Sequence, residues 1–199
     1  MKRLLCLLLL LLTTSALARA GFESDILDLE AQQQAKIGVA LVGEDGNLPQ
    51  GHRANERFAM CSTFKLPLVA LVLSRIETDK ANAEDKLHYD AALLEEYAPA
   101  ARRYVASGYM TVAEAMSAAL QLSDNTATNL LLKKVGGPVA VTNYFRSLGD
   151  KVSRLDRNEP ALNSNILGDA RDTTTPLAMS KNVAKLVFGD ALMPLSNNK

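Results

Sequence analysis

The spacing of apolar and polar positions predicts a helix, two strands and a second helix in the first part of the chain. Apolar residues recur at helical intervals across residues 22–34. Residues 36–42 have the pattern of a strand, and a second short strand is expected to end near residues 57–58. Residues 62–76 are almost wholly apolar apart from Lys65, which is typical of a buried helix.

The rest of the chain is predicted to be mostly helical. Thr111 and Glu114 have the spacing of a capping box, in which each side chain binds a free N–H at the start of a helix. Residues 125–135 form a further apolar helix that ends at two glycines, and residues 139–148 form another.

Residues 154–172 interrupt this helical pattern. They carry many charges without periodicity, which is typical of a long functional loop, and Thr175 and Pro176 then begin a last helix. Two strands followed by helices predict an α+β fold with an all-helical subdomain. Because a two-stranded ribbon is marginal by itself, we expect an incomplete antiparallel sheet of which only the N-terminal strands are present.

The first 20 residues have the pattern of a secretory signal. Lys2 and Arg3 precede an apolar run from Leu4 to Leu12, and small residues follow at cleavage spacing. The run is too short to span a bilayer. We therefore expect a cleaved signal at 1–20, one partial domain at 21–199, export to the periplasm or the medium, and no membrane anchor.

Charge and cysteine content narrow the possible partners. Cleavage would remove three of the 22 basic residues and leave 19 against 22 acidic ones, without a basic stripe. This pattern argues against a nucleic-acid partner. Only Cys61 would remain, so no internal disulfide can form, and a small buried residue is the simplest interpretation of this cysteine.

Ser62 and Lys65 are candidates for an activated nucleophile. Positions i and i+3 share one face of a helix, so the hydroxyl and the amine can approach each other. A helix start favours developing negative charge, and an apolar setting lowers the pKa of a lysine. Such a pair can act as a Ser-Lys nucleophile and base, although the spacing alone is weakly specific.

Ser123, Asp124 and Asn125 lie between two predicted helices. All three residue types favour helix caps, so a structural role explains the tripeptide when it is considered alone. Their position about 60 residues after the Ser62 helix also allows a hydroxyl and an amide to point into a cleft.

Glu159 and Asn163 lie in the long loop, between the charged residues Asp156 and Arg157 on one side and Arg171 and Asp172 on the other. Glu159 by itself could be an ordinary surface carboxylate. If the charges pair across the neck of the loop, a carboxylate and an amide become fixed there. Together they can orient and deprotonate one water molecule.

The sequence gives little support to catalysis through a histidine or a zinc ion. His52 and His88 are the two histidines, and both lie in polar stretches where a solvated surface position is expected. No group of His, Cys and carboxylate residues has the spacing of zinc ligands.

In combination, the motifs resemble class A β-lactamases of the penicillin-recognising serine superfamily. The resemblance runs from about residue 22 to the last residues. It rests on Ser62 to Lys65, Ser123 to Asn125, Gly136 to Pro138, Glu159 to Asn163, and Arg171 to Thr174.

The resemblance implies a serine hydrolase that opens the β-lactam ring of antibiotics and so confers resistance. Ser62 would attack the lactam carbonyl, Lys65 would take or relay its proton, and Ser123 would pass a proton to the ring nitrogen. Glu159 would activate the water that hydrolyses the acyl-enzyme. Whether Lys65 or Glu159 acts first in acylation stays open.

Further roles follow from the same resemblance. Asn125 would bind the substrate's side-chain amide, Asn163 would assist Glu159, and Tyr97 would form a wall of the cleft. Arg157 and Asp172 would form the ion pair that closes the loop, and the bond before Pro160 would be cis. The implied protein is a monomer that uses no metal or cofactor and acts on a small β-lactam.

The chain departs from the family in three places. The Lys-Thr-Gly strand, which supplies a second oxyanion-hole N–H, does not occur in the 199 residues. Asn158 stands where an aromatic residue is common, and some relatives pair the equivalent of Cys61 with a later cysteine. Two hypotheses therefore remain: an active secreted β-lactamase, or an inactive fragment that needs the missing C-terminal portion.

Overall fold

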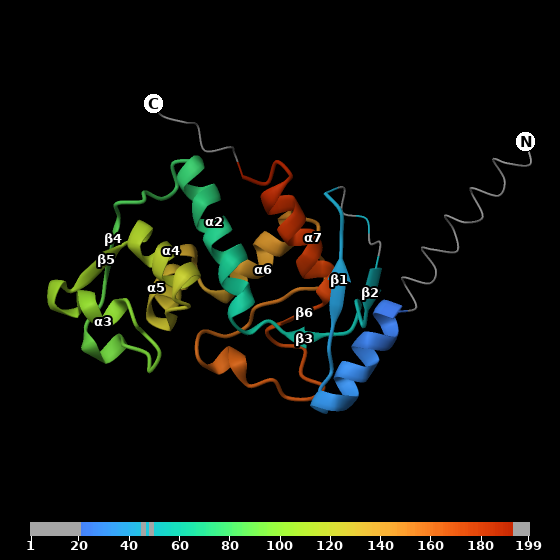
Figure 1. Cartoon of the computed structure of the whole chain (residues 1–199). Coiled ribbons are helices and arrows are strands. Elements are labelled where there is room, and N and C mark those ends of the chain that lie inside the picture. Colours follow the sequence, from blue (N-terminus) through green and yellow to red (C-terminus); the bar gives the residue numbers. More distant parts are fainter. Residues whose placement is uncertain (1–20, 45–46, 48–49, 193–199) are drawn as a thin grey trace, which may run out of the picture.

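The N-terminal helix and the ribbon after it form one end of the molecule (Figure 1). The computed structural model describes residues 21–44, 47 and 50–192, so the expected signal segment at 1–20 lies outside the described residues. Residues 21–33 are helical, as predicted. Glu30 fixes this helix by accepting hydrogen bonds from the Ile37 N–H and from Arg53 Nε, both at 2.7 Å.

Strand β1 (Val39–Leu41) pairs antiparallel with β2 (Gln50–His52). Helix α7 (Pro176–Val187) packs against β1, and its Ser180 donates a hydrogen bond to the Ala40 carbonyl at 3.0 Å. Gly38 makes this packing possible. A Cβ there would come within 2.5 Å of the Phe58 ring and 2.7 Å of Pro176.

The prediction of one second strand ending near residues 57–58 was wrong. The structure separates β2 from a short β3 (Phe58–Ala59), which pairs with β6 (Thr173–Thr174). A turn divides them because Arg53 adopts φ 46° and its carbonyl accepts from the Glu56 N–H. The β3–β6 pairing brings the end of the long loop close to the segment before Ser62.

The predicted helical subdomain is built around α2 (Figure 1). Helix α2 (Lys65–Glu77) packs against α4 (Val112–Gln121), α5 (Asn125–Val135) and α6 (Pro138–Ser147). The predicted capping box is present, with both the Thr111 and Glu114 side chains bonded to backbone N–H groups. The helix predicted over residues 62–76 is divided, because residues 61–64 form a 3₁₀ turn before α2 begins at Lys65.

A third strand pair was not anticipated from the sequence. β4 (Lys86–His88) pairs antiparallel with β5 (Tyr109–Thr111) across about 20 residues that contain α3 (Ala101–Tyr104). The remaining short elements are 3₁₀ turns: η1 (Cys61–Phe64), η2 (Ala91–Leu93), η3 (Val105–Ser107) and η4 (Ala161–Asn163).

The hydrophobic core lies where α2 meets the other helices. Its largest fully buried apolar side chains include Phe64, Leu68, Met110, Leu131 and Phe145. The overall class is therefore the predicted α+β fold, with separate two-stranded sheets instead of one continuous sheet.

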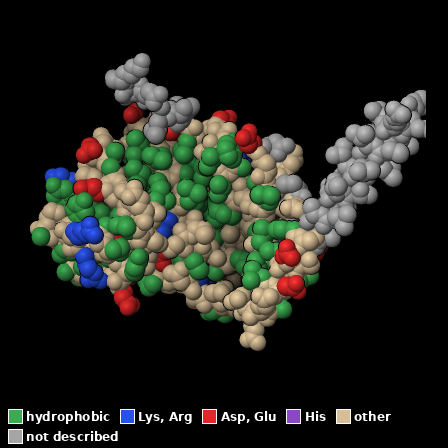
Figure 2. Space-filling model, viewed as in Figure 1, with side chains coloured by type: hydrophobic (Ala, Val, Ile, Leu, Met, Phe, Trp, Pro, Cys, Tyr) green, Lys and Arg blue, Asp and Glu red, His purple; other side chains and the backbone are tan. Residues whose placement is uncertain are grey.

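One face of the molecule carries many hydrophobic side chains, which Figure 2 shows over α2, α7 and β1. Leu41 on β1 is 56% exposed, and Val187 and Phe188 at the end of α7 are 61% and 62% exposed. Among the described residues, β1 has β2 as its strand partner. No helix in this part of the chain has the length and apolar character needed to cross a membrane.

Candidate active site

Ser62 and Lys65 lie on either side of a change in helix type. Ser62 is exposed in the 3₁₀ turn η1, whereas Lys65 is the first residue of α2 and only 2% exposed. The preceding residue, Cys61, adopts φ 43°. This turn presents the hydroxyl to solvent while the lysine beside it enters the core.

The Lys65 ammonium lies at the centre of the polar contacts. Its Nζ donates to the Ser123 carbonyl at 2.8 Å, to Ser123 Oγ at 2.9 Å and to Asn125 Oδ1 at 2.7 Å. Ser123 Oγ in turn donates to Ser62 Oγ at 2.9 Å. The Ser62 hydroxyl and the Lys65 amine are thus joined through the Ser123 hydroxyl.

Opposing effects act on the pKa of Lys65. Burial lowers it, because a charged amine loses its hydration in the core, and this effect outweighs the neighbouring Glu159 and Asp124 carboxylates, which raise it. The net direction is downward. A lysine with a lowered pKa gives up a proton more readily, as a base or proton relay must.

Ser123 to Asn125 serves both of the roles considered from the sequence. Asp124 caps α5, since its Oδ1 accepts from the Ala127 N–H and its Oδ2 from the N–H groups of Ala100 and Ala101, all at 2.9 Å. Ser123 has φ 54°, an uncommon conformation for a non-glycine residue. The buried cap holds this turn so that Ser123 and Asn125 reach Lys65.

The Glu159 carboxylate also contacts Lys65. Its Oε1 is 3.2 Å from Lys65 Nζ, and its Oε2 accepts a hydrogen bond from Asn163 Nδ2 at 2.6 Å. The Glu159 side chain is fully buried. Its Oε1 has the ion pair but no partner with hydrogen-bond geometry, so it retains the capacity to accept a proton donor.

Asn129 was missed in the sequence analysis, although it holds Glu159 in place. Its Oδ1 accepts from the Glu159 N–H and its Nδ2 donates to the Glu159 carbonyl, both at 3.0 Å. Asn129 lies four residues after Asn125 on α5, on the same helix face. That spacing was the available signal.

Tyr97 lies beside this group, at the surface. It is 57% exposed, and its backbone carbonyl accepts from the Asn125 N–H at 3.0 Å. Its side chain is therefore free to face a molecule that approaches Asn125.

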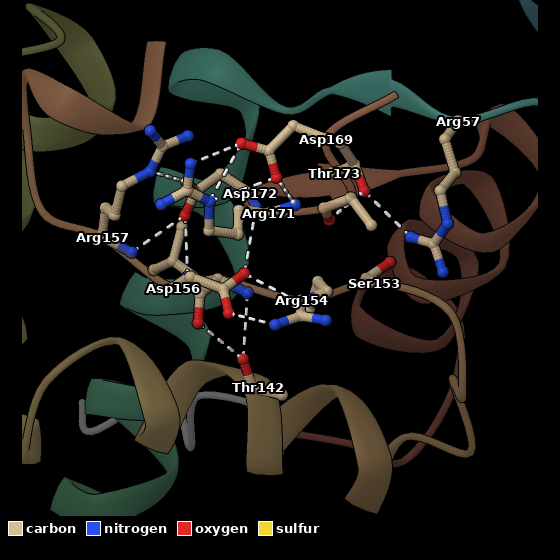
Figure 3. Close-up of polar contacts among 12 residues, drawn as sticks. Arg57, Thr142, Ser153, Arg154, Asp156, Arg157, Asp169, Arg171, Asp172 and Thr173 are labelled. Carbon is tan, nitrogen blue, oxygen red and sulfur yellow. Dashed lines mark hydrogen bonds and ion pairs between the residues drawn. The ribbon is translucent and has the colours of Figure 1, made fainter. Parts of the chain in front are cut away.

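Charged residues close the neck of the long loop (Figure 3). Asp172 Oδ1 accepts from the N–H groups of Asp156 and Arg157 at 2.7 and 2.9 Å, and its Oδ2 pairs with Arg157 Nε at 2.5 Å. Asp156 Oδ2 accepts in return from the Asp172 N–H. Contrary to the expectation, Arg171 does not pair across the neck; it pairs with the nearby Asp169. The bond before Pro160 is cis, as expected.

The loop neck is also connected to the turn that carries Ser62. The Asp172 carbonyl accepts from the Met60 N–H at 2.9 Å, and the Met60 carbonyl accepts from the Thr63 N–H at 3.0 Å. The position of Ser62 therefore depends on the same segment that positions Glu159.

We expect Asp172→Ala to lower the free energy of unfolding by about 3 kcal/mol. The substitution leaves two backbone N–H groups without their acceptor and removes the buried partner of Arg157. Urea denaturation would measure this loss. Asp169→Ala is the control, since Asp169 pairs only locally with Arg171. Equal stability of the Asp172→Ala variant and the unaltered protein would contradict a structural role for the neck.

Two expectations about single residues were wrong. Cys61 is exposed, not buried, because the 3₁₀ turn carries it to the surface. His52 is buried at 9% exposure, with Nε2 3.4 Å from Glu30 Oε2, because the N-terminal helix covers the end of β2. His88 is exposed as expected and its ring lies against Tyr109.

The described residues contain no cluster of His, Cys, Asp or Glu suited to a metal ion.

Comparison with known proteins defines the class of this fold and site. The family model of the β-lactamase enzyme family matches residues 21–199. The β-lactamase OXY-2 of Klebsiella oxytoca is 45% identical over 185 residues, and the alignment covers 92% of this chain and 63% of the relative. The β-lactamase CTX-M-8 of Citrobacter amalonaticus is 44% identical, with 94% and 64% covered.

Solved structures agree. An ancestral class A β-lactamase, reconstructed as the last common ancestor of Gram-negative bacteria, superposes with a TM-score of 0.82 at 46% identity, covering 86% of this chain and 65% of the other. A β-lactamase from Desulfarculus baarsii has the same TM-score at 42% identity. The chain belongs to the β-lactamase enzyme family and resembles its class A members. It spans slightly less than two thirds of the length of the relatives that it matches.

Proposed function

We propose that the protein hydrolyses β-lactams through a serine acyl-enzyme. The observation that carries the proposal is that Lys65 Nζ contacts both proposed reacting groups. It reaches Ser62 through the Ser123 hydroxyl, and it pairs directly with Glu159. The proposed nucleophile and the proposed water-activating base thus share one buried amine.

In acylation, Ser62 Oγ attacks the lactam carbonyl carbon and the ring C–N bond breaks. The contacts of Ser123 suit a proton relay, because its hydroxyl lies within hydrogen-bond distance of both Lys65 Nζ and Ser62 Oγ. With Lys65 as the neutral amine, the Ser62 proton passes to Ser123 Oγ while the Ser123 proton passes to Nζ. The same hydroxyl can protonate the departing ring nitrogen. The lowered pKa of Lys65 supports its part in removing the serine proton.

In deacylation, water attacks the ester that Ser62 carries, and Glu159 takes a proton of that water. The ester C–O bond then breaks, and the proton returns to Ser62 Oγ through Lys65 and Ser123. Glu159 Oε1 suits this role because it is buried and has no hydrogen-bond partner. Asn163 holds the other carboxylate oxygen. A base fixed in this way distinguishes a hydrolase from the related cell-wall transpeptidases, whose esters with β-lactams are slow to deacylate.

Substrate binding is assigned to Asn125 and Tyr97. The Asn125 side chain accepts from Lys65 through Oδ1, which leaves its NH₂ group to donate to a substrate amide. The exposed Tyr97 ring provides an apolar wall beside it. We further propose that the protein is exported by a cleaved signal at residues 1–20, acts as a monomer and confers β-lactam resistance.

The apolar face described above favours a second candidate, in which the chain forms the acyl-enzyme but turns over slowly by itself. Leu41 on β1 is more than half exposed, and β1 pairs with β2 alone among the described strands. An additional strand against β1 would bury this face and could complete the oxyanion hole. Loss of one oxyanion donor costs about two to three powers of ten in rate.

Hydrolysis of nitrocefin by the purified chain tests the proposal. We expect turnover that is absent from a heat-denatured sample. Turnover that rises at least about a hundredfold when a C-terminal segment from a relative is added would favour the second candidate. Absence of both turnover and a covalent adduct under all conditions would refute the proposed function.

A further inference from the structure

A cavity of about 510 Å³ lies beside the catalytic group but does not include it. It opens between η2, the segment after it and the outer face of α5. Its wall includes Leu93, Glu95, Asn129, Leu130 and Lys133. Its size falls in the range of small-molecule sites, which are mostly apolar with a few polar groups.

The two charged residues that line this cavity, Glu95 and Lys133, have opposite charges. The exposed Lys133 ammonium makes no hydrogen bond or ion pair with any residue that the structure describes. Glu95 is hydrogen-bonded to Asn129. Asn129 lies four residues before Lys133 on α5, so the two α5 residues are about one helical turn apart. Leu93, 55% exposed, and the buried Leu130 provide apolar surface in the same cavity. No side chain projects from Gly136 and Gly137, which leaves open space in the wall.

Asn129 connects this cavity to Glu159. Its Nδ2 donates both to Glu95 Oε1 at 2.8 Å, in the cavity, and to the Glu159 carbonyl at 3.0 Å. Its Oδ1 accepts from the Glu159 N–H. Asn158, which directly precedes Glu159, also lines the cavity. A ligand whose amine draws Glu95 Oε1 away from Asn129 removes one of the three hydrogen bonds that fix the Asn129 side chain.

We propose that this cavity binds a small amphipathic carboxylate that bears an amine at its far end, and that its occupancy loosens the hold of Asn129 on Glu159. The carboxylate pairs with Lys133, the apolar body covers Leu93 and Leu130, and the amine donates to Glu95. The regulatory meaning rests on the proposed function, in which Glu159 is the deacylating base. The binding itself does not.

Titration of the ¹⁵N-labelled protein with 4-(aminomethyl)benzoate tests the proposal by NMR. We expect chemical-shift changes at the amides of Leu130, Lys133 and Gly136, with a millimolar dissociation constant typical of so small a ligand. Lys133→Ala is expected to weaken binding about tenfold. Lys134→Ala is the matched control, because its ammonium already pairs with Asp85 at 2.6 Å, and it should leave binding unchanged.

Hydrogen exchange of the Glu159 amide measures the coupling without requiring hydrolysis. At saturating ligand we expect this amide to exchange about tenfold faster, while the Asn125 amide, bonded to the Tyr97 carbonyl, keeps its rate. 4-Methylbenzoate lacks the amine and should bind without this effect. Absence of shifts at the cavity amides, equal affinity of Lys133→Ala, or unchanged Glu159 exchange would overturn the inference. Because neither readout uses a β-lactam, failure here is distinguishable from failure of the proposed function.

Discussion

Ser62→Ala is expected to abolish the covalent adduct that a β-lactam forms with this protein. The substitution removes the oxygen that we propose as the nucleophile, and no other hydroxyl occupies its place beside Ser123 Oγ in the described residues. Intact-protein mass spectrometry after exposure to a penicillin would show the unmodified mass. Removal of a catalytic nucleophile costs several powers of ten in rate, so the loss should be complete on the time scale of the measurement.

Cys61→Ala provides the matched control. The exposed Cys61 thiol directly precedes Ser62 and is the competing nucleophile in this turn. Its removal should leave the adduct intact. An adduct that persists in Ser62→Ala and disappears in Cys61→Ala would transfer the reaction to the thiol and refute the role of Ser62.

Glu159→Ala is expected to have the opposite effect on the adduct and make it accumulate. Ser62, Ser123 and Lys65 keep their mutual hydrogen bonds, so the serine can still be acylated. The water that must release the acyl group loses its base, which costs about two to four powers of ten in rate. Time-resolved mass spectrometry should show an adduct that outlives the substrate.

Two variants sharpen this experiment. Glu159→Gln keeps the size of the side chain and an acceptor for Asn163 but removes the base, so it should also trap the adduct. Asn163→Ala leaves the carboxylate in place without the hydrogen bond to Oε2 and should slow release less. Rapid turnover by Glu159→Ala would contradict the assignment of Glu159, and slow acylation would mean that Glu159 also acts in the first step.

The elements that the sequence predicted well are those with a strong local pattern. Helices α4 and α5 begin at side chains that cap them, Thr111 and Asp124, and such caps act over three or four residues of chain. The strand pairs β3–β6 and β4–β5 were missed because each strand is two or three residues long. Pairing across a long intervening segment leaves little periodicity in so short a stretch.

Single-residue environments were harder to predict than elements. His52 lies in a polar stretch, yet the helix at residues 21–33 covers it and brings Glu30 to 3.4 Å. Cys61 is next to a buried apolar helix, yet the left-handed conformation at φ 43° turns it outward. Both outcomes depend on segments that are distant in sequence or on one backbone angle, and neither leaves a trace in local hydrophobicity.

The sequence by itself determined the chemical parts of the site. The candidate residues Ser62 and Lys65, Ser123 and Asn125, and Glu159 and Asn163 form three short motifs whose members lie within a few residues of each other. The combination of these motifs carries the resemblance to class A β-lactamases, from which the proposed roles of nucleophile, relay and base follow. Only the tertiary structure decided how the pairs meet. It placed Lys65 Nζ between Ser123 and Glu159 and fixed Glu159 through Asn129. The physical reason is that these contacts join α2, α5 and the long loop, whose approach depends on packing of the core and not on any local pattern.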